Sequence, residues 1–352
     1  MKKLHKFLFA LGRPLSPVYS WLMYLRALFY RVGIFKSHSL PVSVISVGNL
    51  TMGGTGKTPV VMYIAKLLIS TERKPAVISR GYGGKSKKRI NVVSDGKRIR
   101  MAVDQSGDEP RLIADALPRV PVLTGPKRAI LGESAITQYY ADTIIMDDGL
   151  QHMSLRRDLN FVLFSARTFL GNGRVFPGGE MREPLTALKR AHGFVITGVD
   201  GKNSKGVDEF KMFLENKFPK RPVFLGKYIP TCLVSLKNTE IITLEKGKTI
   251  KFFGFCGIAD PDSFINTLVR EGFNMVGFRS YRDHHAYSMS DLEELIGNAA
   301  QNEARALITT EKDMVKLRRL KVNFPVYALR IELEMEEFFD RFILSHLRKN
   351  RH

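Results

Sequence analysis

Apolar residues follow two periods along this chain, and their alternation predicts its elements. A β-branched run over 42–47 predicts a buried strand, and apolar residues recur at helical spacing over 60–68. Strands that alternate with helices in this way predict an α/β domain over 41–226, built on a mostly parallel sheet. Further short apolar runs that predict strands of this sheet occupy 76–79, 142–148, 161–164 and 194–197.

A second α/β alternation follows a change of composition. Short β-rich runs within 227–249 predict an extended connector. Residues 250–330 then alternate as strand, helix, strand, helix and strand, which predicts right-handed crossovers and a second, smaller parallel sheet. We assign 331–352 to a C-terminal helix. The expected fold class is therefore α/β, with a second domain after the first.

The first 40 residues have a different pattern. They are rich in Leu, Phe and Tyr and include the only tryptophan, Trp21, but arginines interrupt the apolar run. The longest uncharged stretch, 14–25, has 12 residues, whereas about 18–20 are needed to span a bilayer. Residues 1–40 therefore predict a helical segment that lies on a membrane surface, with aromatic and cationic side chains at the headgroups. The alternative is an amphipathic helix packed on the protein's own core.

Charge and cysteine usage narrow the class of protein. The formal net charge is +21, and the first 71 residues contain nine Lys or Arg and no Asp or Glu. Such a surface suits anionic lipid or nucleic acid. Cys232 and Cys256 form no CxxC pair, which indicates a reducing compartment and argues against a disulfide or a thiolate metal site. A length of 352 residues suffices for two domains with their own cores.

The turn between the first strand and its helix predicts a phosphate-binding loop. Its glycines let backbone N–H groups approach phosphate oxygens, and the helix N-terminus adds positive potential. Lys57 supplies a charge and Thr58 a hydroxyl for Mg²⁺. The usual pattern begins with glycine where this chain has Thr51, so the loop is a variant. A tight turn with a surface lysine is the alternative. The predicted nucleotide-binding residues are Thr51, Met52, Gly53, Gly54, Thr55, Gly56, Lys57 and Thr58.

Two acidic pairs are candidates for metal binding and proton transfer. Asp108 and Glu109 stand at a predicted helix entrance, where they either cap the helix or act on a Mg²⁺-nucleotide, one as base and one on the metal. Asp147 and Asp148 end an apolar strand, where carboxylates reach the ligand crevice of a parallel sheet. A turn-capping pair is the alternative for them.

Several basic and histidine-containing segments each allow both a functional and a structural interpretation. Arg174, Arg182 and Glu183 either grip a phosphorylated sugar or pair among themselves and with Glu180. The basic segment 85–100 is expected to be a loop, and its run KSKKR at 85–89 is either solvated or a contact with substrate phosphate. In the second domain, the cluster Asp283, His284 and His285 either faces the same cleft or is structural, and the TEKD sequence at 310–313 resembles a guanine-binding motif shifted by one residue, from which we infer no guanine specificity.

Seven segments of the chain together resemble one family, the tetraacyldisaccharide 4'-kinases of lipid A synthesis. The similar segments run in order over about 270 residues, and no single one is specific. They are VISVGNLTMGGTGKTP at 44–59, SRGYGG at 79–84, GDEP at 107–110, DDGLQH at 147–152, PGGEMREP at 177–184, DHH at 283–285 and TEKD at 310–313.

The resemblance implies a fold and an activity. The fold is a P-loop NTPase-like α/β/α core domain with a second, smaller α/β domain and an N-terminal membrane-associated helical segment. The activity is transfer of the ATP γ-phosphoryl group to the 4'-hydroxyl of a tetraacyldisaccharide 1-phosphate, which gives lipid IVA on the cytoplasmic face of the inner membrane. The implied partners are that lipid and an anionic membrane surface, with no nucleic acid and no obligate protein partner.

The resemblance also implies roles for particular residues. Asp108 would be the base that accepts the hydroxyl proton, assisted by His284, and Lys57 would neutralise phosphate charge. The remaining implied residues are Thr58, Glu109, Asp147 and Asp148 for Mg²⁺, and Arg128, Gln151, Arg182 and Glu183 for the acylated sugar.

Two other classes remain open from the sequence. A nucleotide-switched membrane adaptor would use the phosphate loop to gate a conformational change, with no small-molecule acceptor. The acids at 108–109 and the histidines at 284–285 argue against it. A nucleic-acid ATPase is suggested by charge alone, because the chain has no clear nucleic-acid-reading module.

Overall fold

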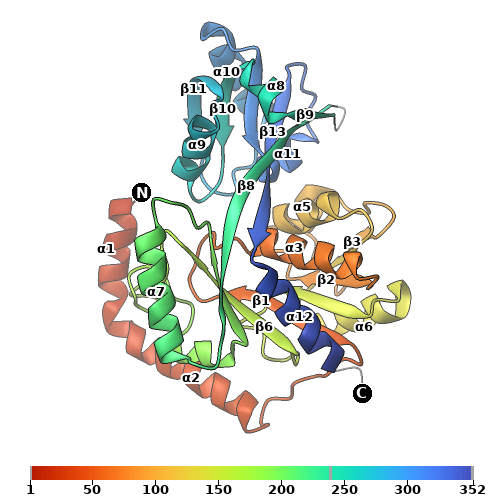
Figure 1. Cartoon of the computed structure of the whole chain (residues 1–352), viewed down its shortest axis with the longest axis vertical. Helices are drawn as coiled ribbons and strands as arrows, with labels where there is room; N and C mark the ends of the chain where they lie inside the picture. Colours follow the sequence, from red (N-terminus) through yellow and green to blue (C-terminus); the bar gives the residue numbers. More distant parts are fainter. Residues whose placement is uncertain (1, 238–239, 350–352) are drawn as a thin grey trace.

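One sheet continues through two lobes of the molecule (Figure 1). The structure is a computed structural model that describes residues 2–237 and 240–349. The strand order in the described residues is β11-β10-β12-β13-β8-β7-β6-β1-β5-β2-β4-β3, with β9 paired to β8. The strands are β1 Ser43–Asn49, β2 Pro75–Ser79, β3 Asn91–Asp95, β4 Pro121–Thr124, β5 Thr143–Asp147, β6 Leu159–Ser165, β7 Gly193–Thr197, β8 Val223–Ser235, β9 Ile241–Thr243, β10 Lys251–Cys256, β11 Asn274–Ser280, β12 Ala306–Thr310 and β13 Val326–Met335.

Helices cover the sheet in both lobes. The first lobe comprises residues 2–226 and the C-terminal helix, and the second lobe comprises 236–325 (Figure 1). The helices are α1 Lys2–Gly12, α2 Ser16–Arg31, α3 Lys57–Ser70, α4 Val103–Ser106, α5 Asp108–Ala116, α6 Arg128–Tyr139, α7 Ser204–Lys217, α8 Leu244–Lys248, α9 Pro261–Arg270, α10 Met289–Gln301, α11 Glu311–Leu317 and α12 Glu337–Lys349, with 3₁₀ turns at Arg13–Leu15 and Leu185–Arg190.

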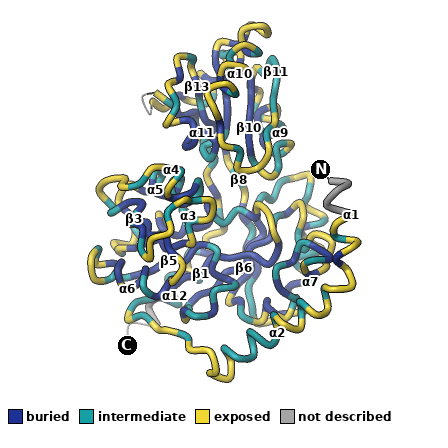
Figure 2. The backbone as a smooth tube through the Cα atoms, turned by 180° about the vertical axis from the view of Figure 1, so that it is seen from behind, coloured by how far each residue is buried: buried dark blue, intermediate teal, exposed yellow. Residues whose placement is uncertain are grey.

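The first-lobe strands are buried on both faces. From β7 through β6, β1, β5 and β2 to β4, all neighbours are parallel, and the backbones of the central strands β1, β5 and β6 are mostly dark blue in Figure 2. Helix-covered parallel strands need apolar side chains on both faces, which explains their continuous apolar runs. The predicted α/β core is thus confirmed. The edge strand β3 runs antiparallel to β4, so the segment 85–100, which we expected to be a loop, contains a strand.

The lobes are joined by a long antiparallel pair, β8 with β13. The first residues of β8 pair with β7 in the first lobe, and its last residues pair with β9 in the second. β13 pairs with β12 at its start and with β8 along its length, from Tyr327 opposite Ser235 to Met335 opposite Gly226. The first part of the expected connector, 227–235, therefore continues a first-lobe strand, whereas its later part contains β9 and the helix α8. The continuation was not recognised because its alternating pattern belongs to a two-lobe ladder rather than to one buried sheet.

The end of the chain returns to the first lobe. Residues 331–335 belong to β13, so the predicted C-terminal helix begins later, at Glu337. Phe339, Ile343 and Leu347 are buried in the same core cluster as Phe161 and Phe224. Residues 331–335 pair with the distant strand β8, and local periodicity does not reveal such pairing. The expected start of the helix was therefore wrong. Residues 350–352 lie outside the described residues.

The N-terminal segment is helical, as expected, and lies along the outside of the first lobe (Figure 1). No residue of α2, all of which lies in the described part of the chain, is fully buried, but three of its side chains contact the lobe. Ser16 Oγ donates to Val175 O, Tyr19 Oη to Arg182 O, and Arg26 Nη2 to Gln151 O. The contacts show that this segment packs in part on the protein's own fold, whereas its binding to a membrane surface stays a prediction. Within residues 2–237 and 240–349, no helix is long and apolar enough to cross a bilayer.

Candidate active site

The phosphate-loop residues lie between β1 and α3, as expected for a nucleotide site. Gly56 adopts a left-handed backbone conformation (φ +73°), and a Cβ there would overlap the hydroxyl of Tyr228. Thr197 Oγ1 donates to Thr55 O at 3.0 Å. Glycine is therefore required at 56, because side chains from β7 and β8 support the loop from below. Met52, Gly53 and Gly54 are exposed, which leaves this part of the loop open to a ligand.

Thr51 occupies the position where glycine was expected, and its surroundings explain the difference. It forms an antiparallel bridge with Met181, and the next residue donates from Met52 N to Glu180 O at 2.7 Å. Thr51 is thus buried, extended backbone that needs no positive φ. The loop is consequently tied to the 174–182 segment, which itself contacts α2.

Lys57 is held at the first turn of α3 by two acceptors. Its Nζ lies 3.2 Å from Asn49 Oδ1 and 3.7 Å from Asp148 Oδ1. Asp148 also accepts from Arg182 Nη1 at 2.9 Å through each of its oxygens. Burial would raise the pKa of the Asp148 carboxyl, but Lys57 and Arg182 outweigh burial and lower it. Asp148 therefore stays ionised between two cations that fit phosphate oxygens.

Asp147 differs from its neighbour. It is the last residue of β5, its side chain is buried, and its Oδ1 has no hydrogen-bond partner in the described residues. Burial, and secondarily the charge of Glu109, raise the pKa of the Asp147 carboxyl to about 7, whereas Lys57 opposes the shift. A buried carboxylate oxygen without a partner, near a second acid, is stabilised either by a proton or by a bound cation.

These acids fit Mg²⁺. No cluster of three or more Asp, Glu, His or Cys within residues 2–237 and 240–349 forms a ready-made metal cage. In nucleotide kinases, Mg²⁺ is typically bound by one or two protein groups together with waters and substrate phosphates. Asp147, together with Glu109, whose charge acts on it, and Thr58 in the first turn of α3, provides ligands of that kind.

Asp108 and His284 meet across the two lobes. His284 Nδ1 lies 3.1 Å from Asp108 Oδ2, and His284 Nε2 lies 3.3 Å from Lys312 Nζ. An ammonium group can only donate, so Nε2 accepts and the imidazole proton lies on Nδ1, directed at Asp108. Burial would raise the pKa of the Asp108 carboxyl, but the hydrogen bond from His284 and the charges of Lys316 and Lys312 outweigh burial and lower it.

The structure separates the two neighbouring histidines. His285 stacks on Tyr281 with ring centroids 4.5 Å apart, and its Nε2 lies 3.2 Å from Asp291 Oδ2, within the capping box of α10. Only His284 points to the first lobe, where its ring also meets that of Tyr82 edge-on. His284 has a left-handed backbone (φ +59°), as does Asp148 (φ +51°), a strain that clusters at functional sites.

Two of the expected substrate contacts, Arg128 and Glu183, are enclosed in the structure. Arg128 is 4% exposed and donates to Gly125 O, and Glu183 is 2% exposed and accepts from Arg190 Nη2 through both oxygens. Burial lowers the pKa of Arg128 to about 10. Side chains so enclosed support the loops around them, and their contact with the acceptor stays a prediction. Gln151 and Arg182 are only half-buried, and Gln151 Nε2 donates to Asn49 O at 3.1 Å.

Four residues of the site were missed in the sequence. Asn49 contacts Lys57, Arg26 contacts the 147–152 loop, and Lys312 and Lys316 face the Asp108–His284 pair. The only available signal was their position next to similar segments, since Lys312 lies within TEKD and Asn49 within the phosphate-loop segment. Nothing in the local pattern distinguished Arg26 from its neighbours on α2.

A phosphate loop, a strand-end carboxylate pair and a carboxylate–histidine pair thus converge near the junction of two α/β lobes. Fold and site together define the class: a P-loop kinase with a second α/β lobe.

Comparisons with known proteins identify the family. A family model described as Tetraacyldisaccharide-1-P 4'-kinase matches residues 8–348. The chain is 45% identical to a tetraacyldisaccharide 4'-kinase of Desulfotalea psychrophila over 96% of each chain, and 40% identical to that of Syntrophus aciditrophicus over 92% and 91%. It superposes with a TM-score of 0.77 and 31% identity on LpxK from Aquifex aeolicus, solved in complex with ATP, over 95% of this chain and 98% of that one. The chain belongs to the tetraacyldisaccharide 4'-kinase family, the ATP-dependent kinases of lipid A biosynthesis.

Proposed function

We propose that this protein transfers the γ-phosphoryl group of Mg²⁺-ATP to the 4'-hydroxyl of a tetraacyldisaccharide 1-phosphate at the cytoplasmic face of an anionic membrane. The observation that carries the proposal is the Asp108–His284 contact of 3.1 Å between lobes, because it directs a proton acceptor into the same junction as the phosphate loop. The reaction requires neither nucleic acid nor a second protein chain.

The nucleotide is bound by the first lobe. The loop amides of 53–57 and the Lys57 ammonium neutralise the β- and γ-phosphate oxygens, and Arg182 lies next to Lys57 through their shared contact with Asp148. Thr58, Glu109, Asp147 and Asp148 are the candidate groups for Mg²⁺. When bound, the ion neutralises charge that develops on the transferred phosphoryl group.

Proton transfer is the task of Asp108. As the 4'-oxygen attacks the γ-phosphorus, its proton passes to Asp108, the new O–P bond forms, and the bond to the β–γ bridging oxygen breaks to release ADP. His284, donating from Nδ1, keeps Asp108 Oδ2 oriented and stabilises its charge before transfer. The half-buried Gln151 and Arg182 are the candidate contacts for the sugar.

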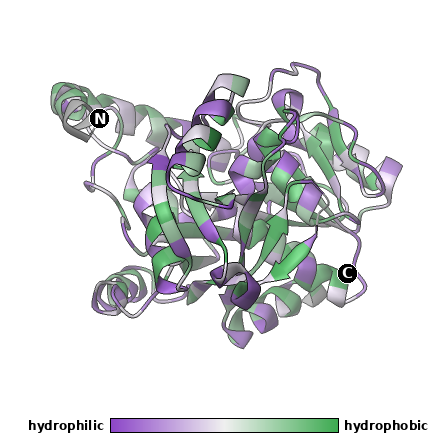
Figure 3. Ribbon diagram, turned by 90° about the horizontal axis from the view of Figure 1, so that it is seen from above, coloured by the Kyte–Doolittle hydropathy of each residue, from purple (hydrophilic) through white to green (hydrophobic). Residues whose placement is uncertain are grey.

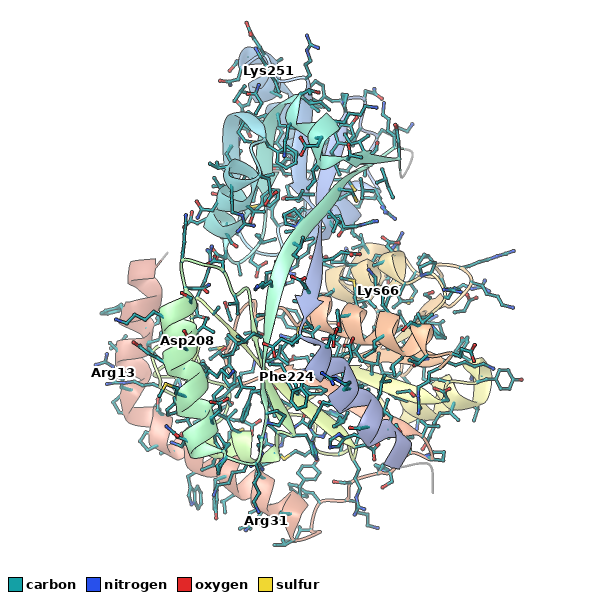
Figure 4. All side chains as sticks on the ribbon, viewed as in Figure 1. Arg13, Arg31, Lys66, Asp208, Phe224 and Lys251 are labelled. Atoms are coloured by element: carbon teal, nitrogen blue, oxygen red, sulfur yellow. The ribbon has the colours of Figure 1, made fainter. Side chains whose placement is uncertain are left out.

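Helices α1 and α2 provide the protein surface that binds the membrane. Exposed apolar side chains follow this segment, and Arg13 and Arg31 lie on its outer side (Figure 4). In Figure 3, α1 stands at the periphery of the molecule with apolar and polar residues on its surface. Aromatic and apolar groups beside arginines suit the headgroup region of an anionic bilayer. The exposed apolar residues are Phe7, Leu8, Leu11, Leu15, Val18, Trp21, Leu22 and Tyr24.

A radiolabel experiment tests the proposal. Protein, γ-labelled ATP, Mg²⁺ and the acylated disaccharide 1-phosphate are mixed in detergent, and we expect label in the lipid fraction. Omission of Mg²⁺ and the Asp108→Asn variant serve as controls: the first should leave the lipid unlabelled, and the second should slow labelling by about 10²- to 10⁴-fold. A protein that binds ATP but labels no lipid would instead be the nucleotide-switched adaptor.

A further inference from the structure

Lys316, on α11 of the second lobe, is a buried lysine whose ammonium group faces the first lobe. Its Nζ lies 2.9 Å from Asp313 Oδ1 and 3.6 Å from Asp108 Oδ2. Lys316 is 4% exposed and Asp313 0% exposed. Lysine is almost never buried to this extent without a partner, and here it has two, one from each lobe.

Asp313 has the contacts of an anchor. Its Oδ2 accepts from Gly257 N–H at 2.9 Å, just past the end of β10, and from Thr310 Oγ1 at 2.8 Å, at the N-cap of α11. The remaining oxygen, Oδ1, is the one that contacts Lys316. The carboxylate therefore connects two elements of the second lobe and holds the ammonium group at a defined position.

The same ammonium group and His284 converge on one oxygen of Asp108. His284 Nδ1 lies 3.1 Å from Oδ2, and Lys316 Nζ lies 3.6 Å from that atom. Lys312 completes the arrangement from the far side of the ring, 3.3 Å from His284 Nε2 and 3.3 Å from Asp283 Oδ1. The charged groups that act most strongly on Asp108 thus all come from the second lobe.

We propose that Lys316, fixed by Asp313, is a positioning residue that orients the Asp108 carboxylate when the second lobe packs on the first. This rests on the proposed role of Asp108 as the base. The TEKD segment, whose similarity to a guanine-binding motif suggested no function, then has one: Thr310 and Asp313 fix Lys316, and Lys312 fixes His284. Lys316 is buried and then acts through Asp108.

Steady-state transfer kinetics test the inference. Lys316→Met removes the charge and keeps most of the side-chain volume. We expect kcat to fall on the order of 10- to 100-fold, the scale of a catalytic group displaced by about 1 Å. The KM for ATP should stay within about twofold, because the phosphate loop lies in the other lobe. Lys316→Arg, which keeps a positive charge near Asp108, should recover part of the loss.

A matched lysine controls for loss of an ion pair. Lys251 pairs with Glu303 on the surface, 3.1 Å apart, at the far end of the second lobe (Figure 4). Lys251→Met should leave kcat and both KM values unchanged.

Lys316→Met leaves Asp313 buried without a counter-charge, which can destabilise the protein. A second variant therefore tests whether lost stability explains the fall in kcat. In Lys316→Met with Asp313→Asn, no buried charge remains, and the asparagine oxygen can still accept from Gly257 and Thr310. This double variant should fold and should show the same fall in kcat with unchanged KM for ATP.

The decisive measurement is a double-mutant cycle with Asp108→Asn. If Lys316 acts through Asp108, removing its charge should cost less than about twofold in the Asp108→Asn background. An undiminished kcat in both charge-free variants, or the same loss with and without Asp108→Asn, would overturn the inference. A wild type that labels no lipid, or an Asp108→Asn variant with normal kcat, would instead overturn the proposed function or its base.

Discussion

The nucleotide side and the proton-transfer side of this site are built differently. Lys57, Asp148 and Arg182 all belong to the first lobe, and their contacts depend on β1, β5 and the 174–182 segment of that lobe. Asp108 and His284 belong to different lobes, and their contact depends on how the lobes pack.

Because of this difference, ATP binding depends on the first lobe alone, whereas proton transfer depends on the packing of both lobes. A change that loosens the lobes leaves the phosphate loop intact, because Thr197 and Tyr228 support it from within the first lobe and the start of β8. The same change removes His284, Lys312 and Lys316 from Asp108. ATP affinity and kcat are therefore expected to respond to different substitutions, and the following predictions test that separation.

The largest effect is expected at Asp108. Asp108→Asn removes the proton acceptor, and general-base catalysis contributes about 10²- to 10⁴-fold, so kcat should fall within that range with ATP affinity nearly unchanged. His284→Ala should resemble it, and the double variant should lose less than the product of the single losses. Glu109→Gln is the neighbouring control: if Glu109 holds metal, the Mg²⁺ concentration for half-maximal rate should rise. Fully multiplicative losses would show that Asp108 and His284 act separately.

Lys57 tests the nucleotide side of the site, which belongs to the first lobe. Lys57→Ala removes charge compensation from the phosphates, and kcat/KM should fall on the order of 100-fold or more. Nucleotide binding, measured by titration calorimetry, should weaken as well, in contrast to Asp108→Asn. Lys66→Ala, on the same helix and in an exposed pair with Glu332, should change neither. Near-normal transfer by Lys57→Ala would refute the phosphate-loop role.

A smaller effect is expected at the membrane surface. Deleting 1–35 should weaken membrane association, but it would also remove the contacts of Ser16, Tyr19 and Arg26 with the first lobe. Replacing the exposed Leu11, Leu15 and Trp21 by Ser is cleaner and should lower binding to anionic vesicles on the order of 10-fold or more, with activity in detergent retained.

Met212→Ser, at an exposed position of α7, is the control for the vesicle measurement and should bind as the wild type does. If the triple variant still sediments fully with the vesicles, the membrane-binding surface lies elsewhere.

The smallest effect concerns His152, in the first lobe. Burial, and then the nearby charges of Arg128, Arg157, Arg26 and Arg80, lower the pKa of His152 to about 4. Between about pH 6.5 and pH 4 the unfolded chain binds the extra proton, so this residue makes stability fall as pH falls through that window. In urea unfolding, His152→Gln should therefore lose less stability than the wild type between pH 7.5 and pH 5. Equal losses would show that His152 does not titrate in this way.

Much of the nucleotide side of the site could be predicted from the sequence. The phosphate loop, the strand that ends at Asp147 and the parallel α/β core depend on local periodicity and short motifs, so a chain segment of 10 to 20 residues contains the signal. The start of the helix at Asp108 could also be predicted, because Pro110 follows it at a position typical of a first helical turn.

Contacts between distant segments were not predictable in detail. The choice between His284 and His285 depends on which ring faces Asp108 and which stacks on Tyr281. The burial of Arg128 and Glu183 depends on loops that close over them, so both resembled surface charges in the sequence.

By itself, the sequence determined the α/β class, the phosphate loop, the acidic pairs and the cationic, aromatic N-terminal segment, because each is a property of neighbouring residues. Only the tertiary structure decided that β8 and β13 form one ladder through both lobes, that α12 packs in the first-lobe core, and that Lys316 reaches Asp108. Those features depend on side chains far apart in the chain, whose approach is set by packing of the complete sheet and leaves no period or spacing in the local sequence.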